Sequence, residues 1–135
     1  MIFTKLKLNN FKSHENTVIS FNKGISVIVG ENGAGKSTIL EAISFALFKQ
    51  HTGKRIDDLV RNNAQSMSVE LEFTSNNREY KIVREKKSNL KSSIYKKTSS
   101  EGGYAHICTG DKEVASEIRQ ILDIDSDLFL NAIYI

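Results

Sequence analysis

The sequence contains no proline or tryptophan and only one cysteine, Cys108, in 135 residues. One cysteine cannot form an internal disulfide, and with three scattered histidines it excludes a cysteine-rich zinc module. No apolar run approaches the roughly 20 residues that cross a bilayer. Residues 1–10 alternate apolar and polar side chains, unlike the apolar stretch of a secretory signal. We therefore expect one intracellular domain that does not insert into a membrane.

The net charge of +3 is unevenly distributed along the chain. Residues 78–97 carry +6, because eight basic residues stand against Glu79 and Glu85, and the remainder carries −3. One interpretation is that lysines fill the wet faces of a hairpin and protect an edge strand. The other is a row of cations, with Tyr80 and Tyr95 interleaved, that follows a phosphate backbone. The second predicts DNA contacts by Arg84, Lys86, Lys87, Lys91, Lys96 and Lys97.

The first third of the chain has strand patterns followed by a helix pattern. Residues 2–8 alternate, and Asn9 and Asn10 are expected to end that strand. Residues 17–21 form a second short strand, and the apolar run 25–29 is typical of a strand buried on both faces. One face of the first strand should carry Ile2, Thr4, Leu6 and Leu8.

Residues 36–48 place apolar side chains at helical spacing. They predict a mostly buried helix with Glu41 and Ser44 on its polar side.

Residues 67–108 have the pattern of an antiparallel meander. Strict alternation over 67–74 and the turn signal Asn76-Asn77 indicate half-buried strands joined by tight turns. Apolar residues at helical spacing after Asp111 predict an amphipathic helix. The apolar end at residues 132–135 has no cap or polar tail, which indicates that the chain is part of a longer protein.

Residues 30–37 read Gly-Glu-Asn-Gly-Ala-Gly-Lys-Ser and fit G-x-x-x-x-G-K-[ST]. The motif follows a predicted buried strand and opens a predicted helix, as phosphate binding requires. Its glycines let backbone N–H groups surround phosphate oxygens, and the helix N-terminus adds its dipole. Lys36 would then reach the β- and γ-phosphates, Ser37 would bind Mg²⁺, and Thr38 would contact the α-phosphate.

Phosphate binding alone does not give hydrolysis. A P-loop ATPase also needs a buried strand that ends in aspartate, and the nearest match, residues 121–125, closes a helix. Residues 100–103 (Ser-Glu-Gly-Gly) resemble an ABC signature, but they lie between two strand patterns and are better interpreted as a hairpin turn. We therefore expect the chain to bind a nucleotide and not to hydrolyse it alone.

Four segments together resemble the Rad-fifty family, the SMC-like ABC ATPases of DNA double-strand break repair. They are residues 10–14 (Asn-Phe-Lys-Ser-His), the loop 30–37, residues 38–43 (Thr-Ile-Leu-Glu-Ala-Ile) and residues 129–135 (Phe-Leu-Asn-Ala-Ile-Tyr-Ile). Their order and spacing match the family over essentially the whole chain. The resemblance implies an α/β fold: the N-terminal lobe of a P-loop ABC-type ATPase head, with a mixed sheet around the P-loop helix and an antiparallel β subdomain. Residues 1–60 would be the P-loop part, 66–109 the meander, and 111–135 a helix and the start of the Q-loop strand.

The resemblance also implies ATP and Mg²⁺ as ligands, with Lys36 as the residue that stabilises the reacting phosphates and Ser37 on the metal ion. Lys12 stands where the family often has an arginine that contacts the nucleotide, and lysine keeps the charge without the bidentate fork. Arg61 sits where the family approaches the nucleotide. The remaining catalytic groups would lie beyond residue 135, and a zinc hook would lie in a coiled coil outside the chain. The residues implied around the triphosphate are Asn32, Gly33, Ala34, Gly35, Lys36, Ser37 and Thr38.

The implied partners are the C-terminal lobe of the same ATPase, a second ATP-bound head, the Mre-eleven nuclease and double-stranded DNA. ATP-driven head dimerisation would control the nuclease and DNA tethering. The Lys- and Ile-rich, proline-free composition favours a prokaryotic, archaeal source, with the protein in the cytoplasm at the nucleoid; a eukaryotic protein would be nuclear.

Three alternatives stay open. One is another SMC-, SbcC- or RecF-like ATPase. A second is a P-loop kinase, which would need an arginine-bearing lid that the basic meander does not resemble. A third is a DNA-binding module with a vestigial phosphate loop, which nucleotide affinity would distinguish.

Overall fold

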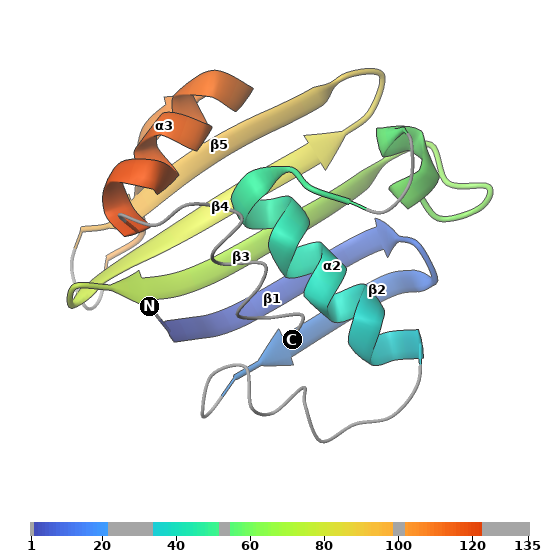
Figure 1. Cartoon of the computed structure of the whole chain (residues 1–135), viewed down its shortest axis with the longest axis horizontal. Coiled ribbons are helices and arrows are strands. Elements are labelled where there is room, and N and C mark those ends of the chain that lie inside the picture. Colours follow the sequence, from blue (N-terminus) through green and yellow to red (C-terminus); the bar gives the residue numbers. More distant parts are fainter. Residues whose placement is uncertain (1, 22–33, 52–54, 99–101, 123–135) are drawn as a thin grey trace.

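The computed structural model describes residues 2–21, 34–51, 55–98 and 102–122. The described strands form one antiparallel six-stranded sheet in the order β2-β1-β3-β4-β5-β6, and the two described α-helices lie on the same face of it (Figure 1). The elements are β1 (Ile2–Phe11), β2 (His14–Ser20), α2 (Ala34–Phe48), the 3₁₀ helix η1 (Ile56–Leu59), β3 (Met67–Ser75), β4 (Arg78–Lys86), β5 (Leu90–Lys97), β6 (Tyr104–Thr109) and α3 (Asp111–Leu122).

The predicted meander is present as β3 to β6, and β1 pairs with β3. The first two strands and the meander therefore share one sheet. The strand predicted at 25–29, which would make that sheet mixed, lies outside the described residues. None of the described helices is long and apolar enough to span a membrane.

The alternation of buried and exposed side chains along β1 is interrupted near the start of the strand. Phe3, Leu6 and Leu8 are buried, whereas Ile2 is 57% exposed. The register against β3 shifts just after Phe3, at a bulge around Thr4. A bulge adds one residue to a strand and so reverses which side chains face the core. The prediction that Ile2 and Thr4 share the face of Leu6 is therefore wrong.

The same strand continues through Asn9 and Asn10, so the prediction that they end it is wrong. Asn10 takes the left-handed conformation, with φ 52°, which asparagine adopts more easily than most residues. The strand ends at Phe11, which is fully buried and bridges to Val60. Because of this bridge, the turn that follows Phe11 lies against the segment after η1.

The alternation predicted for β3 is confirmed, since every second side chain from Met67 to Ser75 is buried. Asn76 and Asn77 have φ of 53° and 63°, the pair of positive values found in tight type I′ hairpins. This turn returns the chain into β4 and stacks Tyr80 on Phe73 with ring centroids 5.5 Å apart. Tyr80 is consequently buried and cannot stack on a nucleic-acid base.

Helix α2 is buried on all sides over residues 40–47. The prediction of a polar side is wrong, because Glu41 and Ser44 are buried too. Their polar groups have partners inside the protein: the Ser44 hydroxyl donates to the Leu40 carbonyl at 3.0 Å, and Glu41 pairs with Lys12. A helix can therefore bury polar residues where such bonds replace those to water.

Candidate functional site

The helix predicted to open directly after the phosphate loop begins at Ala34, so the last residues of the motif form the first turn of α2. The first N–H groups of a helix have no partner within the helix, which suits them to bind an anion. Thr38 follows in the second turn and is half-buried. Asn32 and Gly33 lie outside the described residues. The first turn contains Ala34, Gly35, Lys36 and Ser37.

Lys12 occupies the tight turn between β1 and β2. Its φ is 51°, and its backbone N–H donates to the Leu59 carbonyl at 2.7 Å. The ammonium group forms an ion pair with Glu41 of α2, where the lysine side chain is 32% exposed and the glutamate side chain 6%. Residues 37 and 41 are one helical turn apart, about 6 Å along the axis. The fold therefore brings Lys12 to the helix that carries the phosphate-loop motif.

Arg61 lies beside the same turn. Its backbone N–H donates to the Asn10 carbonyl at 2.8 Å, and its guanidinium is 3.8 Å from the Glu15 carboxylate. Lys12 and Arg61, predicted separately, are thus held next to each other by the segment after η1. The sequence analysis missed Glu41 as a partner of Lys12; its place four residues after Ser37 was the available signal.

The prediction that Arg84 contacts DNA is wrong, because its side chain is buried and the residue is only 1% exposed. Its Nε donates to the Ala46 carbonyl at 2.8 Å, and its Nη1 donates to the Ser92 hydroxyl at 2.8 Å. A weaker bond of 3.4 Å reaches the Leu47 carbonyl. Burial lowers the pKa of Arg84 to about 10, an effect that the charge of Asp111 partly offsets. Arg84 is charged at neutral pH but faces the end of α2 and cannot reach DNA.

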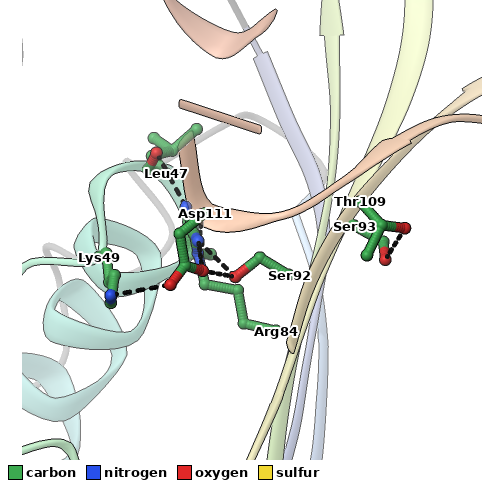
Figure 2. A network of polar contacts seen from close by, with 8 residues as sticks. Leu47, Lys49, Arg84, Ser92, Ser93, Thr109 and Asp111 are labelled. Atoms are coloured by element: carbon green, nitrogen blue, oxygen red, sulfur yellow. Dashed lines mark hydrogen bonds and ion pairs between the residues drawn. The ribbon is translucent and has the colours of Figure 1, made fainter. Parts of the chain in front are cut away.

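Asp111 completes this network at the start of α3 (Figure 2). Its carboxylate accepts bonds from Ser92 at 2.6 Å and from Lys49 at 2.9 Å, and it lies 3.9 Å from Arg84. Burial raises the pKa of Asp111, but the two bonds and the charges of Lys49 and Arg84 outweigh burial and leave the pKa below its usual value. The network joins the C-terminus of α2 to the N-terminus of α3, with charges that complement both helix dipoles.

The remaining predicted DNA contacts do not form one row. Lys86 is mostly buried and pairs with Asp57 at 2.9 Å; this bond and the charge of Lys86 lower the pKa of Asp57. Lys97 pairs with Glu79 at 3.3 Å, and Lys96 is half-buried. Two others, Lys87 and Lys91, are exposed around the β4–β5 turn and form no ion pair with a described residue. Of the predicted DNA contacts, the fully exposed ones therefore lie at that turn.

The sheet face without described helices carries a polar cluster around Tyr104. Its hydroxyl donates to the Glu72 carboxylate at 2.7 Å, and the Lys81 ammonium lies 4.6 Å from its ring centroid. Burial, followed by the bond and charge of Glu72, raises the pKa of Tyr104 above its usual value. Among the described residues, no group of three His, Cys, Asp or Glu side chains could hold a metal ion.

Comparison with known proteins identifies relatives over the whole chain. The DNA double-strand break repair Rad50 ATPase of Methanocaldococcus jannaschii is 42% identical over 135 residues, which cover 100% of this chain and 13% of that protein. The corresponding protein of Thermoplasma volcanium is 37% identical over 136 residues, which cover 100% of this chain and 15% of that protein. The chain thus spans about an eighth to a seventh of these relatives' length.

Solved structures share the fold of this chain. The head domain of SMC from Thermotoga maritima matches 87% of this chain and 42% of its own, with a TM-score of 0.52 and 26% identity. The recombination mediator protein RecF in its ATP complex matches 68% of this chain and 26% of its own, with a TM-score of 0.58 and 23% identity. The family described as AAA domain matches residues 5–134. The chain therefore belongs to the AAA domain family, and its relatives include archaeal Rad50 ATPases.

Proposed function

We propose that this chain is the ATP-binding part of a DNA double-strand break repair ATPase. The observation that carries the proposal is that the motif G-x-x-x-x-G-K-S runs directly into α2, which begins at Ala34. Full-length similarity to Rad50 ATPases supports the repair assignment. The proposed cellular location of the protein is the cytoplasm of a prokaryotic cell, at the nucleoid.

Residues 32–38 would hold the triphosphate, with Lys36 stabilising charge on the reacting phosphates and Ser37 on Mg²⁺. The start of α2 fits these ligands, because its first turn supplies N–H groups, a lysine and a hydroxyl. Ser37 would help to hold Mg²⁺, which would supply positive charge against the phosphates. Lys12, on the β1–β2 turn, and Arg61, in the segment after η1, would flank the nucleotide.

Turnover would require the C-terminal lobe, which supplies the missing catalytic groups. Two such heads would close on ATP, and that closure would control the Mre-eleven nuclease and DNA tethering.

The test is magnesium-dependent ATP binding and hydrolysis by the chain alone and with the C-terminal lobe. We expect binding by the chain, turnover only in the mixture, and loss of turnover in Lys36→Ala. Lys112→Ala, an exposed lysine of α3, is the matched control and should behave as wild type. Hydrolysis by the chain alone would contradict the proposal, since it would require a complete catalytic site.

Double-stranded DNA is the proposed polyanionic partner, and Arg84 is no longer among the residues proposed to contact it. The exposed Lys87 and Lys91 are the strongest candidates, and Lys86, Lys96 and Lys97 lie on the neighbouring strands.

Loss of two phosphate contacts should reduce the slope of log affinity against log salt by about 1.8. We expect this reduction for Lys87→Ala/Lys91→Ala. The control is Lys5→Ala/Lys7→Ala, two exposed lysines of β1. Equal losses in both pairs would show that the β4–β5 turn has no special role.

A further inference from the structure

Both described α-helices lie on one face of the sheet (Figure 1), and the opposite face carries an aromatic cluster on β4, β5 and β6. The Lys81 ammonium lies 5.3 Å from the ring centroid of Tyr95 and 4.6 Å from that of Tyr104. The ring of His106 meets Tyr95 edge-on, with centroids 5.5 Å apart and an angle of 63° between the planes. These four residues are called the outer-face cluster below.

Tyr104 is held along the surface of the sheet. Its side chain starts on the edge strand β6, yet its hydroxyl donates to the Glu72 carboxylate of β3 at 2.7 Å. Because β4 and β5 lie between these two strands, and neighbouring strands are about 4.8 Å apart, the side chain must run across the sheet. The ring is thus oriented before any ligand binds. Tyr95 and Tyr104 are half-buried and His106 is exposed, so a ligand can reach the rings.

The charges beside the cluster are nearly balanced. On this face, β4 and β5 carry three cations and two carboxylates: Lys81, Lys91, Lys97, Glu79 and Glu85. Lys97 pairs with Glu79 at 3.3 Å, and Glu85 stands opposite the exposed Lys91. A ligand on this face would therefore gain more affinity from the rings than from charge. Lys91 also belongs to the β4–β5 turn and lies about 13 Å along the strand from Tyr95, so the cluster continues the proposed DNA surface.

We propose that the outer-face cluster binds single-stranded nucleic acid, with unpaired bases stacked on Tyr95 and Tyr104. Bases within a duplex stack on one another, whereas an unpaired base offers its face to an aromatic side chain whatever its sequence. A strand separated from a duplex at the β4–β5 turn would meet Tyr95 next along β5. The inference goes beyond the proposed function, because it requires neither ATP nor the phosphate loop.

The test compares a fluorescein-labelled oligothymidine of about 12 nucleotides, within the range that one single-strand site covers, with a duplex of equal length. Fluorescence anisotropy on the full chain gives both affinities. We expect Tyr95→Leu and Tyr104→Leu each to weaken oligothymidine binding about tenfold and to leave duplex binding unchanged. Tyr95→Phe should bind as wild type, because it keeps the ring. The slope of log affinity against log salt should stay the same in all variants, because no cation is lost.

A second readout and a control make the test specific. The chain contains no tryptophan, so stacking should quench its tyrosine fluorescence directly, and less so in Tyr95→Leu. The control is Val18→Ala. Val18 is 56% exposed on β2 and stands opposite Lys7 on the same sheet face, so its loss should leave both affinities unchanged.

Three outcomes would overturn the inference: no oligothymidine binding by wild type, full affinity in Tyr95→Leu, or equal losses for oligothymidine and duplex. Circular dichroism checks the folding of each variant. If Tyr104→Leu does not fold, the comparison of Tyr95→Leu with Tyr95→Phe decides alone. A chain that binds no Mg-ATP would remove the proposed function and leave this inference standing.

Discussion

Replacement of Arg84 by methionine tests the network between α2 and α3. Methionine keeps much of the side-chain volume, so the cavity contribution should be small. The substitution removes the donors to the carbonyls of Ala46 and Leu47 and to Ser92. A buried polar group that loses its partner costs about 1–3 kcal/mol. Asp111 keeps its bonds to Lys49 and Ser92, so no carboxylate is left unpaired. We expect a loss of about 3 kcal/mol in the free energy of unfolding.

Urea denaturation followed by far-UV circular dichroism measures this loss as a lower midpoint at unchanged slope. Arg78→Met is the control, because Arg78 is exposed on the same strand and should change stability by less than about 0.5 kcal/mol. Arg84→Lys should have a free energy of unfolding between those of wild type and Arg84→Met, since an ammonium keeps the charge but lacks the planar fork of the guanidinium. If Arg84→Met is as stable as wild type, the carbonyls have found other donors and the network contributes no net stability.

Three further predictions concern pH and backbone strain. Because the pKa of Asp111 is lowered in the folded state, its contribution is present above its unfolded pKa and is lost as the pH falls through the folded value. Asp111→Asn should therefore be less stable at neutral pH, with a difference that shrinks in acid denaturation curves below about pH 4. Because the pKa of Tyr104 is raised in the folded state, its contribution is present below its unfolded pKa, near about 10, and is lost as the pH rises through the folded value, so Tyr104→Phe should be less stable than wild type in urea denaturation at neutral pH, by a margin that shrinks at strongly alkaline pH. Gly110 has φ 123°, so Gly110→Ala should cost about 1–3 kcal/mol in urea denaturation, whereas Gly103→Ala, with open space around it, should cost little.

Most elements of the fold follow from local patterns. The alternation of β3, the Asn76-Asn77 turn and the amphipathic α3 are each specified by a few neighbouring residues, and each is confirmed. The errors arise where distant contacts override the pattern. The bulge near Thr4 turns Ile2 away from the core, and no residue type in this segment predicts a bulge.

The candidate site likewise has features that local sequence predicts and features that it does not. The start of α2 after the phosphate loop was predictable, because the motif and the helix are adjacent in sequence. The charge balance between Lys12 and Glu41 was not, since it depends on a turn and a helix brought together by the fold. Arg84 shows the opposite failure: a basic residue in a basic segment is buried because alternation turns its side chain toward α2.

The pairing of β1 with β3 also has a consequence for how the chain folds. The other neighbouring strands are joined by short connections, whereas residues 12–66 separate β1 from β3. Closing a loop of roughly 55 residues costs about 2 kcal/mol more entropy than closing a four-residue turn. We therefore expect this ladder to form late, after the local hairpins. The segment that it encloses contains the phosphate loop and α2, so a partly folded chain on the ribosome would have no assembled nucleotide site.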